Sequence, residues 1–89
     1  MQSDYGKWAE ILKTLGHPIR IRILESLMET EKCVSTIWAH LDLPQSTVSQ
    51  HLSLLRSKGI VQHERSGSKV KYFVRDKRIQ EIIKLIKAK

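Results

Sequence analysis

The amino-acid sequence predicts a mainly α-helical fold that carries one small β-hairpin. Apolar residues recur at spacings of three and four along most of the chain, as they do in amphipathic helices. After Gly59 the spacing changes to two, in two short segments that flank the turn-forming cluster Arg65-Ser66-Gly67-Ser68-Lys69. The predicted order of elements is α-α-(β)-α-α-β-β-α, and a helix pair followed by such a hairpin is a winged helix-turn-helix.

The first part of the chain has the signals of three helices. Pro18 suits the first position of a helix, where its missing N–H costs little. Ser3 or Asp4 can cap the helix before it, and Ser35 can cap the helix after it. Cys33-Val34 is short and contains a β-branched residue, which favours a brief extended piece. The expected helices span residues 5–15, 18 to about 28, and 36 to about 41.

The fourth helix lies in the stretch from Leu43 to Gly59, and the rest of the chain is organised around it. Pro44 should occupy its first position, and Gly59 should close it in a left-handed conformation. One stripe of this helix is apolar and should face the core: Val48, Leu52 and Leu55. The opposite face is polar but uncharged: Gln45, Ser46, Thr47, Ser49 and Gln50.

This uncharged polar face favours contact with DNA. A solvated helix face normally carries Lys and Glu, whereas Gln, Ser and Thr can donate to and accept from the base edges of a major groove. Gln50 is the best candidate for direct readout, because a Gln side chain can bond an adenine bidentately. A merely polar helix is the alternative that this face alone leaves open.

The last part of the chain should form the hairpin and a final helix. The strands are expected at Ile60–Glu64 and Val70–Val74, and Asp76 can cap a helix from Lys77 to about Ala88. That helix has an apolar stripe that nothing later in the chain covers, so it should pack on the first helix, on a second copy of the chain, or on both. The expected dimer interface is Trp8, Ile11, Leu12, Leu15, Ile79, Ile82, Ile83 and Ile86.

Length and composition indicate one small domain, residues 1–89. A core of that size is marginal, and pairing with a second copy would help it. The chain is 40% hydrophobic and 28% charged, as in ordinary soluble globular proteins. No apolar run approaches the roughly 18 residues of a membrane span, and the N-terminus lacks the pattern of a signal peptide. A single cysteine permits no internal disulfide, which fits a reducing cytoplasm.

Positive charge is concentrated in the second half of the chain. Residues 1–44 hold five Lys/Arg and six Asp/Glu, for a net charge of −1. Residues 45–89 hold eleven Lys/Arg and three Asp/Glu, for a net charge of +8. This asymmetry indicates a polyanionic partner, with a simple solubility charge as the alternative.

The motifs resemble those of the ArsR/SmtB family of small bacterial repressors over nearly the whole chain. The segment Leu15-Gly16-His17-Pro18-Ile19-Arg20 is similar to the family's entry to the second helix, and Leu43–Leu52 is similar to its recognition-helix signature. Leu55-Arg56, Gly59-Ile60-Val61 and Tyr72-Phe73 match residues that lead into the wing or lie on its second strand. The ordered series makes the resemblance specific, whereas any one motif alone would mean little.

The resemblance implies a homodimer joined through its first and last helices, with double-stranded DNA as its partner. It implies that paired recognition helices read an imperfect palindrome and that repression works by blocking RNA polymerase. Members of the family usually release DNA in response to an inducer, which the sequence does not identify here. A cytoplasmic, nucleoid-associated location in a bacterium or archaeon, without membrane association, follows from the same resemblance.

Three departures from the family bear on its signal. The arsenic and cadmium sensors carry Cys-x-Cys on the third helix, where this chain has Cys33-Val34-Ser35. The last helix has acidic residues but no His, unlike the zinc and nickel sensors, and Trp38 replaces a small residue. We therefore expect no metal site and no cofactor, because His17, His40, His51, His63 and Cys33 form no tight ligand pair. A redox or metal response through Cys33 in a dimer stays open.

The expected function is that of a sequence-specific DNA-binding repressor and not of an enzyme. The sequence has no catalytic triad in context, no glycine-rich phosphate loop and no paired carboxylates. A winged-helix protein-interaction module is the alternative, against which the base-reading face and the basic half argue. The residues expected to contact DNA are Gln45, Ser46, Thr47, Ser49 and Gln50 at bases, His51, Arg56 and Lys58 near the backbone, and Arg65, Ser68 and Lys69 on the wing.

Overall fold

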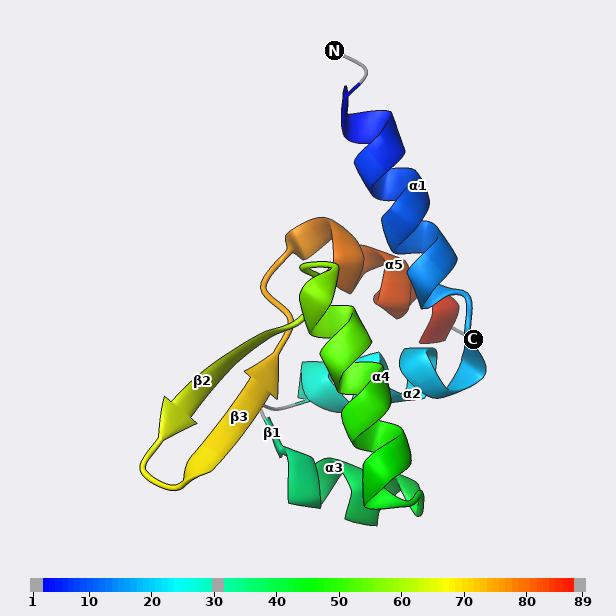
Figure 1. Cartoon of the computed structure of the whole chain (residues 1–89). Coiled ribbons are helices and arrows are strands. Elements are labelled where there is room, and N and C mark those ends of the chain that lie inside the picture. Colours follow the sequence, from blue (N-terminus) through cyan, green and yellow to red (C-terminus); the bar gives the residue numbers. More distant parts are fainter. Residues whose placement is uncertain (1–2, 30–31, 88–89) are drawn as a thin grey trace.

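The computed structural model describes residues 3–29 and 32–87, without the side chains of residues 3, 32–36 and 38. Its elements follow the predicted order, which confirms the winged helix-turn-helix fold (Figure 1). The helices are α1 (Ser3–Leu15), α2 (Pro18–Glu29), α3 (Val34–Leu41), α4 (Gln45–Ser57) and α5 (Lys77–Lys87), and the strands are β1 (Lys32–Cys33), β2 (Gln62–Ser66) and β3 (Lys69–Phe73).

Several helix starts differ from the prediction. Helices α1 and α3 each begin two residues earlier, so that Asp4 and Ser35 lie inside a helix and not at its cap. Asp4 is in the first turn of α1, where negative charge is favourable. Pro44 precedes α4 instead of opening it, because its ψ of 142° is extended and not helical.

The C-terminal end of α4 forms as the glycine predicted. Gly59 has a φ of +75°, the left-handed conformation of a helix-closing residue. Its amide donates to the carbonyl of Arg56 (3.0 Å), and the amide of Ile60 donates to that of Leu55 (2.9 Å). These two bonds make a Schellman motif, and Ile60 and Leu55 supply the apolar contact that accompanies it, since both are fully buried.

Both strands of the hairpin differ from the prediction, since β2 lies two residues later and β3 lies one residue earlier than expected. Ile60 and Val61 are buried in the connection after α4, and β2 starts only at Gln62. Strand β3 pairs with β2 on one side and with the short β1 on the other, in the antiparallel order β1-β3-β2. The pair Ser66↔Lys69 closes the hairpin around Gly67, whose φ is +65°. The turn is therefore limited to Gly67 and Ser68, and Arg65, Ser66 and Lys69 of the predicted turn lie in the strands.

The core is built around α2, against which α4 and α5 both pack. Ile23 and Leu24 of α2 are completely buried, as are the apolar stripe of α4 and the Ile79–Ile83 side of α5. Figure 1 shows α4 across the front of the molecule, with the hairpin extending to one side and α1 projecting beyond the body. Helix α5 ends at Lys87 within the described residues, and Ala88 lies outside them. No helix among residues 3–29 and 32–87 has the length and apolar character needed to cross a membrane.

Candidate nucleic-acid interface

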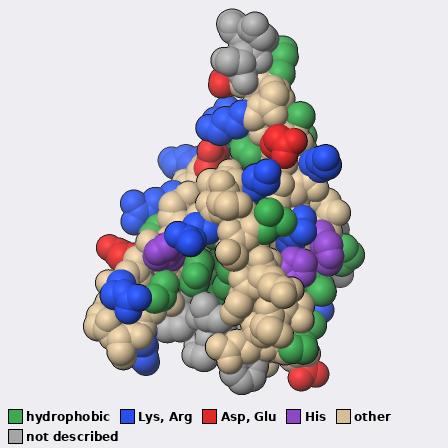
Figure 2. Space-filling model, in the orientation of Figure 1, with side chains coloured by type: hydrophobic (Ala, Val, Ile, Leu, Met, Phe, Trp, Pro, Cys, Tyr) green, Lys and Arg blue, Asp and Glu red, His purple; other side chains and the backbone are tan. Residues whose placement is uncertain are grey.

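Helix α4 presents the uncharged polar face that its sequence predicted. Val48, Leu52 and Leu55 are at most 1% exposed and hold the helix on the core. The opposite side carries Gln45, Ser46, Ser49 and Gln50, all exposed, with Thr47 half-buried beside them. In Figure 2 the front of the molecule over α4 is largely uncharged, while Lys and Arg side chains gather over the hairpin. The anchored apolar side therefore turns a row of donors and acceptors outward.

The first turn of α4 has free amide groups to offer. Pro44 is its N-cap, and no side chain makes a capping hydrogen bond there. The first N–H groups of a helix lack partners within the helix, and together with the helix dipole they favour an anion. A DNA phosphate at this end would meet donors from the backbone as well as from side chains.

Two residues expected near the DNA backbone make contacts inside the protein. His51 accepts a hydrogen bond at Nδ1 from Nε of Arg20 (3.2 Å), and Lys58 Nζ lies 3.4 Å from Glu10 Oε1. Both side chains stand on the flank of α4 that faces α1 and the start of α2. Their contact with DNA stays a prediction, but the structure shows that they also tie α4 to the neighbouring helices.

A second histidine adjoins His51. The rings of His17 and His51 are 4.7 Å apart between centroids, and Nδ1 of His17 accepts from the amide of Ile19 (3.1 Å). Burial lowers the pKa of His51 below its ordinary value of 6.5, and the nearby His17 and Arg20 lower it further. No pattern in the sequence pointed to His17 and Arg20 as neighbours of His51.

The wing presents its basic residues from both sides of the hairpin. Arg65, Ser68 and Lys69 are all exposed at or beside the tip. Arg65 stands opposite Val70. Lys69 stands opposite Ser66, and this second pair is one position nearer the tip of the hairpin. Because successive strand residues point to opposite faces, Arg65 and Lys69 project from different faces of the wing. Arg56, in the last turn of α4, is also exposed.

Only some of the residues expected to form the dimer interface are exposed on the surface of the protomer. Ile11, Leu15, Ile79 and Ile83 are buried in the protomer's own core, with exposures of 4% or less. Leu12 and Ile86 are 53% and 50% exposed, and Trp8 and Ile82 are half-buried. Tyr5 and Leu85, which were not among the residues expected at the interface, are 80% and 75% exposed.

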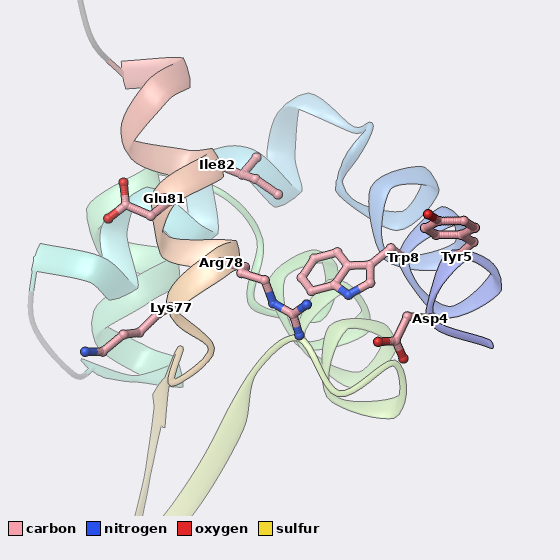
Figure 3. Close-up of a pocket in the computed structure, with 7 residues that line it drawn as sticks. All are labelled: Asp4, Tyr5, Trp8, Lys77, Arg78, Glu81 and Ile82. Carbon is pink, nitrogen blue, oxygen red and sulfur yellow. The ribbon is translucent and has the colours of Figure 1, made fainter. Parts of the chain in front are cut away.

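An apolar groove of about 660 Å³ lies between α1 and α5 on this surface (Figure 3). Tyr5 and Trp8 come from α1, Ile82 from α5, and charged residues stand around them. The Arg78 guanidinium lies 4.4 Å from the centre of the Trp8 ring. The Trp8 Nε1 atom is buried without a hydrogen-bond partner among the described residues. An exposed apolar groove next to exposed apolar side chains marks this as an interaction surface.

The side chains of Cys33, the candidate for a redox or metal response, and of Trp38, which replaces a small residue of the family, lie outside the part that the structure describes. The backbone places Cys33 in β1, opposite Lys71 of β3. Within the part of the chain that the structure describes, no three His, Cys, Asp or Glu residues are grouped so that they could hold a metal ion. His40 and His63 are exposed on α3 and β2, away from the His17–His51 pair.

Comparison with known proteins places this geometry in a family. Residues 17–63, from the start of α2 to β2, match the family model described as bacterial regulatory protein, arsR family. The chain belongs to the ArsR family. It is therefore a DNA-binding transcriptional regulator, in which α3 and α4 form the helix-turn-helix and the β2–β3 hairpin forms the wing.

Individual ArsR-family relatives cover nearly the whole chain. A helix-turn-helix transcriptional regulator of Methanocaldococcus jannaschii is 43% identical over 83 residues, which are 92% of this chain and 93% of that protein. The crystal structure of the transcriptional repressor PagR of Bacillus anthracis superposes with a TM-score of 0.90 and 37% identity, over 97% of this chain and 99% of that one. The homodimeric winged helix-turn-helix DNA-binding domain of a Mycobacterium bovis protein gives a TM-score of 0.84 and 26% identity, over 92% and 76%.

Proposed function

We propose that this ArsR-family chain is a transcriptional repressor, and that residues 1–89 act as one domain that binds an imperfect palindrome as a homodimer. The observation that carries the proposal is the outward face of α4, which is polar and uncharged from Gln45 to Gln50 and lies opposite a fully buried stripe. Similarity to PagR, a repressor, supports the direction of regulation. Binding over a promoter would block RNA polymerase, in the cytoplasm where promoters are.

Base reading is assigned to the outward face of α4. Its side chains are exposed, apart from the half-buried Thr47, and can each donate and accept, as base edges in the major groove require. Gln50 is assigned the direct contact, because its amide can bond N6 and N7 of adenine together. The residues assigned to bases are Gln45, Ser46, Thr47, Ser49 and Gln50.

Phosphate contacts are assigned to the residues around this face. Arg56 in the last turn of α4, and Arg65, Ser68 and Lys69 on the wing, are exposed and can reach the backbone on either side of the groove. His51 and Lys58 stand at the inner edge of the face, where their bonds to Arg20 and Glu10 support the helix as well. Such contacts set affinity and orientation, whereas base contacts set specificity.

Dimerisation is assigned to α1 and α5. Leu12, Leu85 and Ile86 are at least half exposed, and they are the kind of side chain that a partner normally covers. A second copy is the occupant that fits, since one short helix reads only a few base pairs and two-fold pairing doubles the contacts. The homodimeric relative from Mycobacterium bovis supports the same assembly.

The test is fluorescence anisotropy of the purified protein on DNA from upstream of its own gene and on scrambled DNA, across a salt series. Specific repressors bind their sites about 10³-fold or more tighter than other DNA. A preference of that size supports the proposal. Equal and steeply salt-dependent binding to both DNAs, for this and neighbouring promoters, would contradict it, because it would mean a charge-driven coating of DNA.

A further inference from the structure

Arg20 stands where three helices meet. It lies in the first turn of α2, and its Nη1 donates to the carbonyl oxygen of Thr14 in the last turn of α1 (2.9 Å). Its Nε donates to Nδ1 of His51, near the middle of α4 (3.2 Å). One guanidinium therefore connects α1, α2 and the recognition helix. Its planar fork of donors can make both bonds at once, which a Lys side chain could not do with the same geometry.

The bond from Arg20 specifies the protonation state of His51. A ring nitrogen that accepts a hydrogen bond cannot carry a proton, so the proton of His51 must be on Nε2. His17 is held in the same way, because its Nδ1 accepts from the amide of Ile19 at the start of α2. The centroids of the two rings are 4.7 Å apart, so the His17 ring lies beside any proton added to His51.

Protonation of His51 would reverse the contact. A new Nδ1–H would face the Nε–H of Arg20, and a positive ring would lie beside the guanidinium. In the described chain, the titratable and charged groups that act on His51 are His17, from the turn between α1 and α2, and Arg20, from α2. Neither can accept from the protonated nitrogen in this arrangement, and both oppose the added charge. Burial acts in the same direction and is the largest reason that the pKa of His51 is lowered.

We propose that Arg20 is a positioning residue of the recognition helix, and that it holds α4 against α1 only while His51 is neutral. Acid then releases α4 from this link. The inference rests on base reading by α4, as proposed above. Its consequence is a loss of specificity, because base contacts carry the sequence information and depend on the placement of α4, whereas phosphate contacts carry no sequence information. Added positive charge on His51 favours any DNA, so affinity for scrambled DNA should not fall with it.

The test measures the ratio of affinities for operator and scrambled DNA at about pH 8 and at an acidic pH at which histidine ¹⁵N NMR shows that His51 is protonated, because the pKa of His51 lies below the ordinary histidine value of about 6.5. The wild-type ratio should fall about five-fold or more in acid, the effect of losing one ordinary hydrogen bond. His51→Asn keeps an acceptor oxygen at the position of Nδ1 and cannot be protonated, so its ratio should be the same at both pH values. Arg20→Lys keeps the charge but not the fork, and its ratio should already be low at about pH 8.

Three results would overturn the inference: an equal fall in His51→Asn, a ratio that rises in acid, or a wild-type ratio that does not change. Absence of specific binding by the wild type at about pH 8 would instead contradict the base reading on which the inference rests. In that case, and equally if Arg20→Lys does not fold, histidine ¹⁵N NMR of the wild-type protein tests the link between Arg20 and His51 directly, because it shows which ring nitrogen of His51 carries the proton. The Nε2–H form of His51 at neutral pH supports the link to Arg20, and the Nδ1–H form refutes it.

Discussion

Replacing Gln50 with Ala separates base reading from every other source of DNA affinity. Gln50 is exposed on the side of α4 opposite to the buried Val48 and Leu52. Its truncation therefore leaves the core intact, and the free energy of unfolding should change by no more than about 0.5 kcal/mol, as at other surface positions. A good bidentate pair between a side chain and a base discriminates by about 1–3 kcal/mol, which is about five-fold to about 150-fold in Kd for each half-site.

A dimer presents Gln50 twice, so a symmetric operator should lose twice that free energy, about 2–6 kcal/mol. The assay is anisotropy on the operator, on operators with single adenines replaced, and on scrambled DNA. The wild-type protein should lose affinity at one particular base pair of each half-site, and Gln50→Ala should become indifferent to that pair. Equal weakening on all DNAs would refute the reasoning, since it would show that Gln50 contributes no sequence information.

Other substitutions test the remaining assignments. Lys69→Ala should weaken all sequences alike and reduce the salt slope by about 1 per protomer, while a loss confined to the operator would contradict a phosphate contact. Ile82→Glu should give a monomer or an unfolded chain by light scattering, and an unchanged dimer mass would exclude α5 from the interface. Gly59→Ala should lower the free energy of unfolding by about 1–2 kcal/mol in urea, because its φ of +75° strains a residue with Cβ although nothing crowds that atom. The pKa of His51 is lower in the folded protein than in the unfolded chain, so acid favours the unfolded chain. The contribution of neutral His51 to the free energy of unfolding should therefore be fully present above about pH 6.5 and decline as the pH falls below that value. The His51→Asn variant should lack this pH-dependent contribution.

The elements that carry function could be predicted because local geometry determines them. The stripe of Val48, Leu52 and Leu55 has the spacing of one helix face, and all three residues are buried. Gly59 closes α4 because a residue without Cβ is needed at a positive φ. The outward face of α4 then follows from the same period, without any knowledge of the rest of the fold.

The supports of α4 could not be predicted, because they depend on how the helices pack. Arg20 and His51 are separated by 31 residues, and Glu10 and Lys58 by 48. Their meeting depends on the crossing of α1, α2 and α4, which no local spacing encodes. The one available signal was that His51 and Lys58 stand seven residues apart, and so on one side of the helix, outside its uncharged polar face. Side chains that can make polar contacts but lie outside that face suggest partners within the protein.

The sequence also could not show which residues of the apolar stripe on α5 are buried in the protomer and which are exposed. Its four Ile residues look alike in the sequence, but Ile79 and Ile83 are buried by α2 and the core, whereas Ile86 is 50% exposed and Leu85, outside the stripe, is 75% exposed. The hydrophobic period shows that a face is apolar, and only the packing shows which part of it the protomer uses. The remainder, with Leu12 and the groove beside Trp8, is the surface left for a partner.

Helix α1 connects this partner surface to the recognition helix. Leu12, which is assigned to the proposed dimer interface, is 53% exposed on α1, while Glu10 and the carbonyl of Thr14 hold α4 from the same helix, through Lys58 and Arg20. In a dimer the separation of the two recognition helices must match half-sites about 34–36 Å apart, one turn of DNA. With α1 in both contacts, a change in α1 would alter that separation and the orientation of α4 together. A substitution in α1 should therefore shift the half-site spacing that the protein prefers in its operator DNA, whereas a substitution on the β2–β3 wing should leave that spacing unchanged.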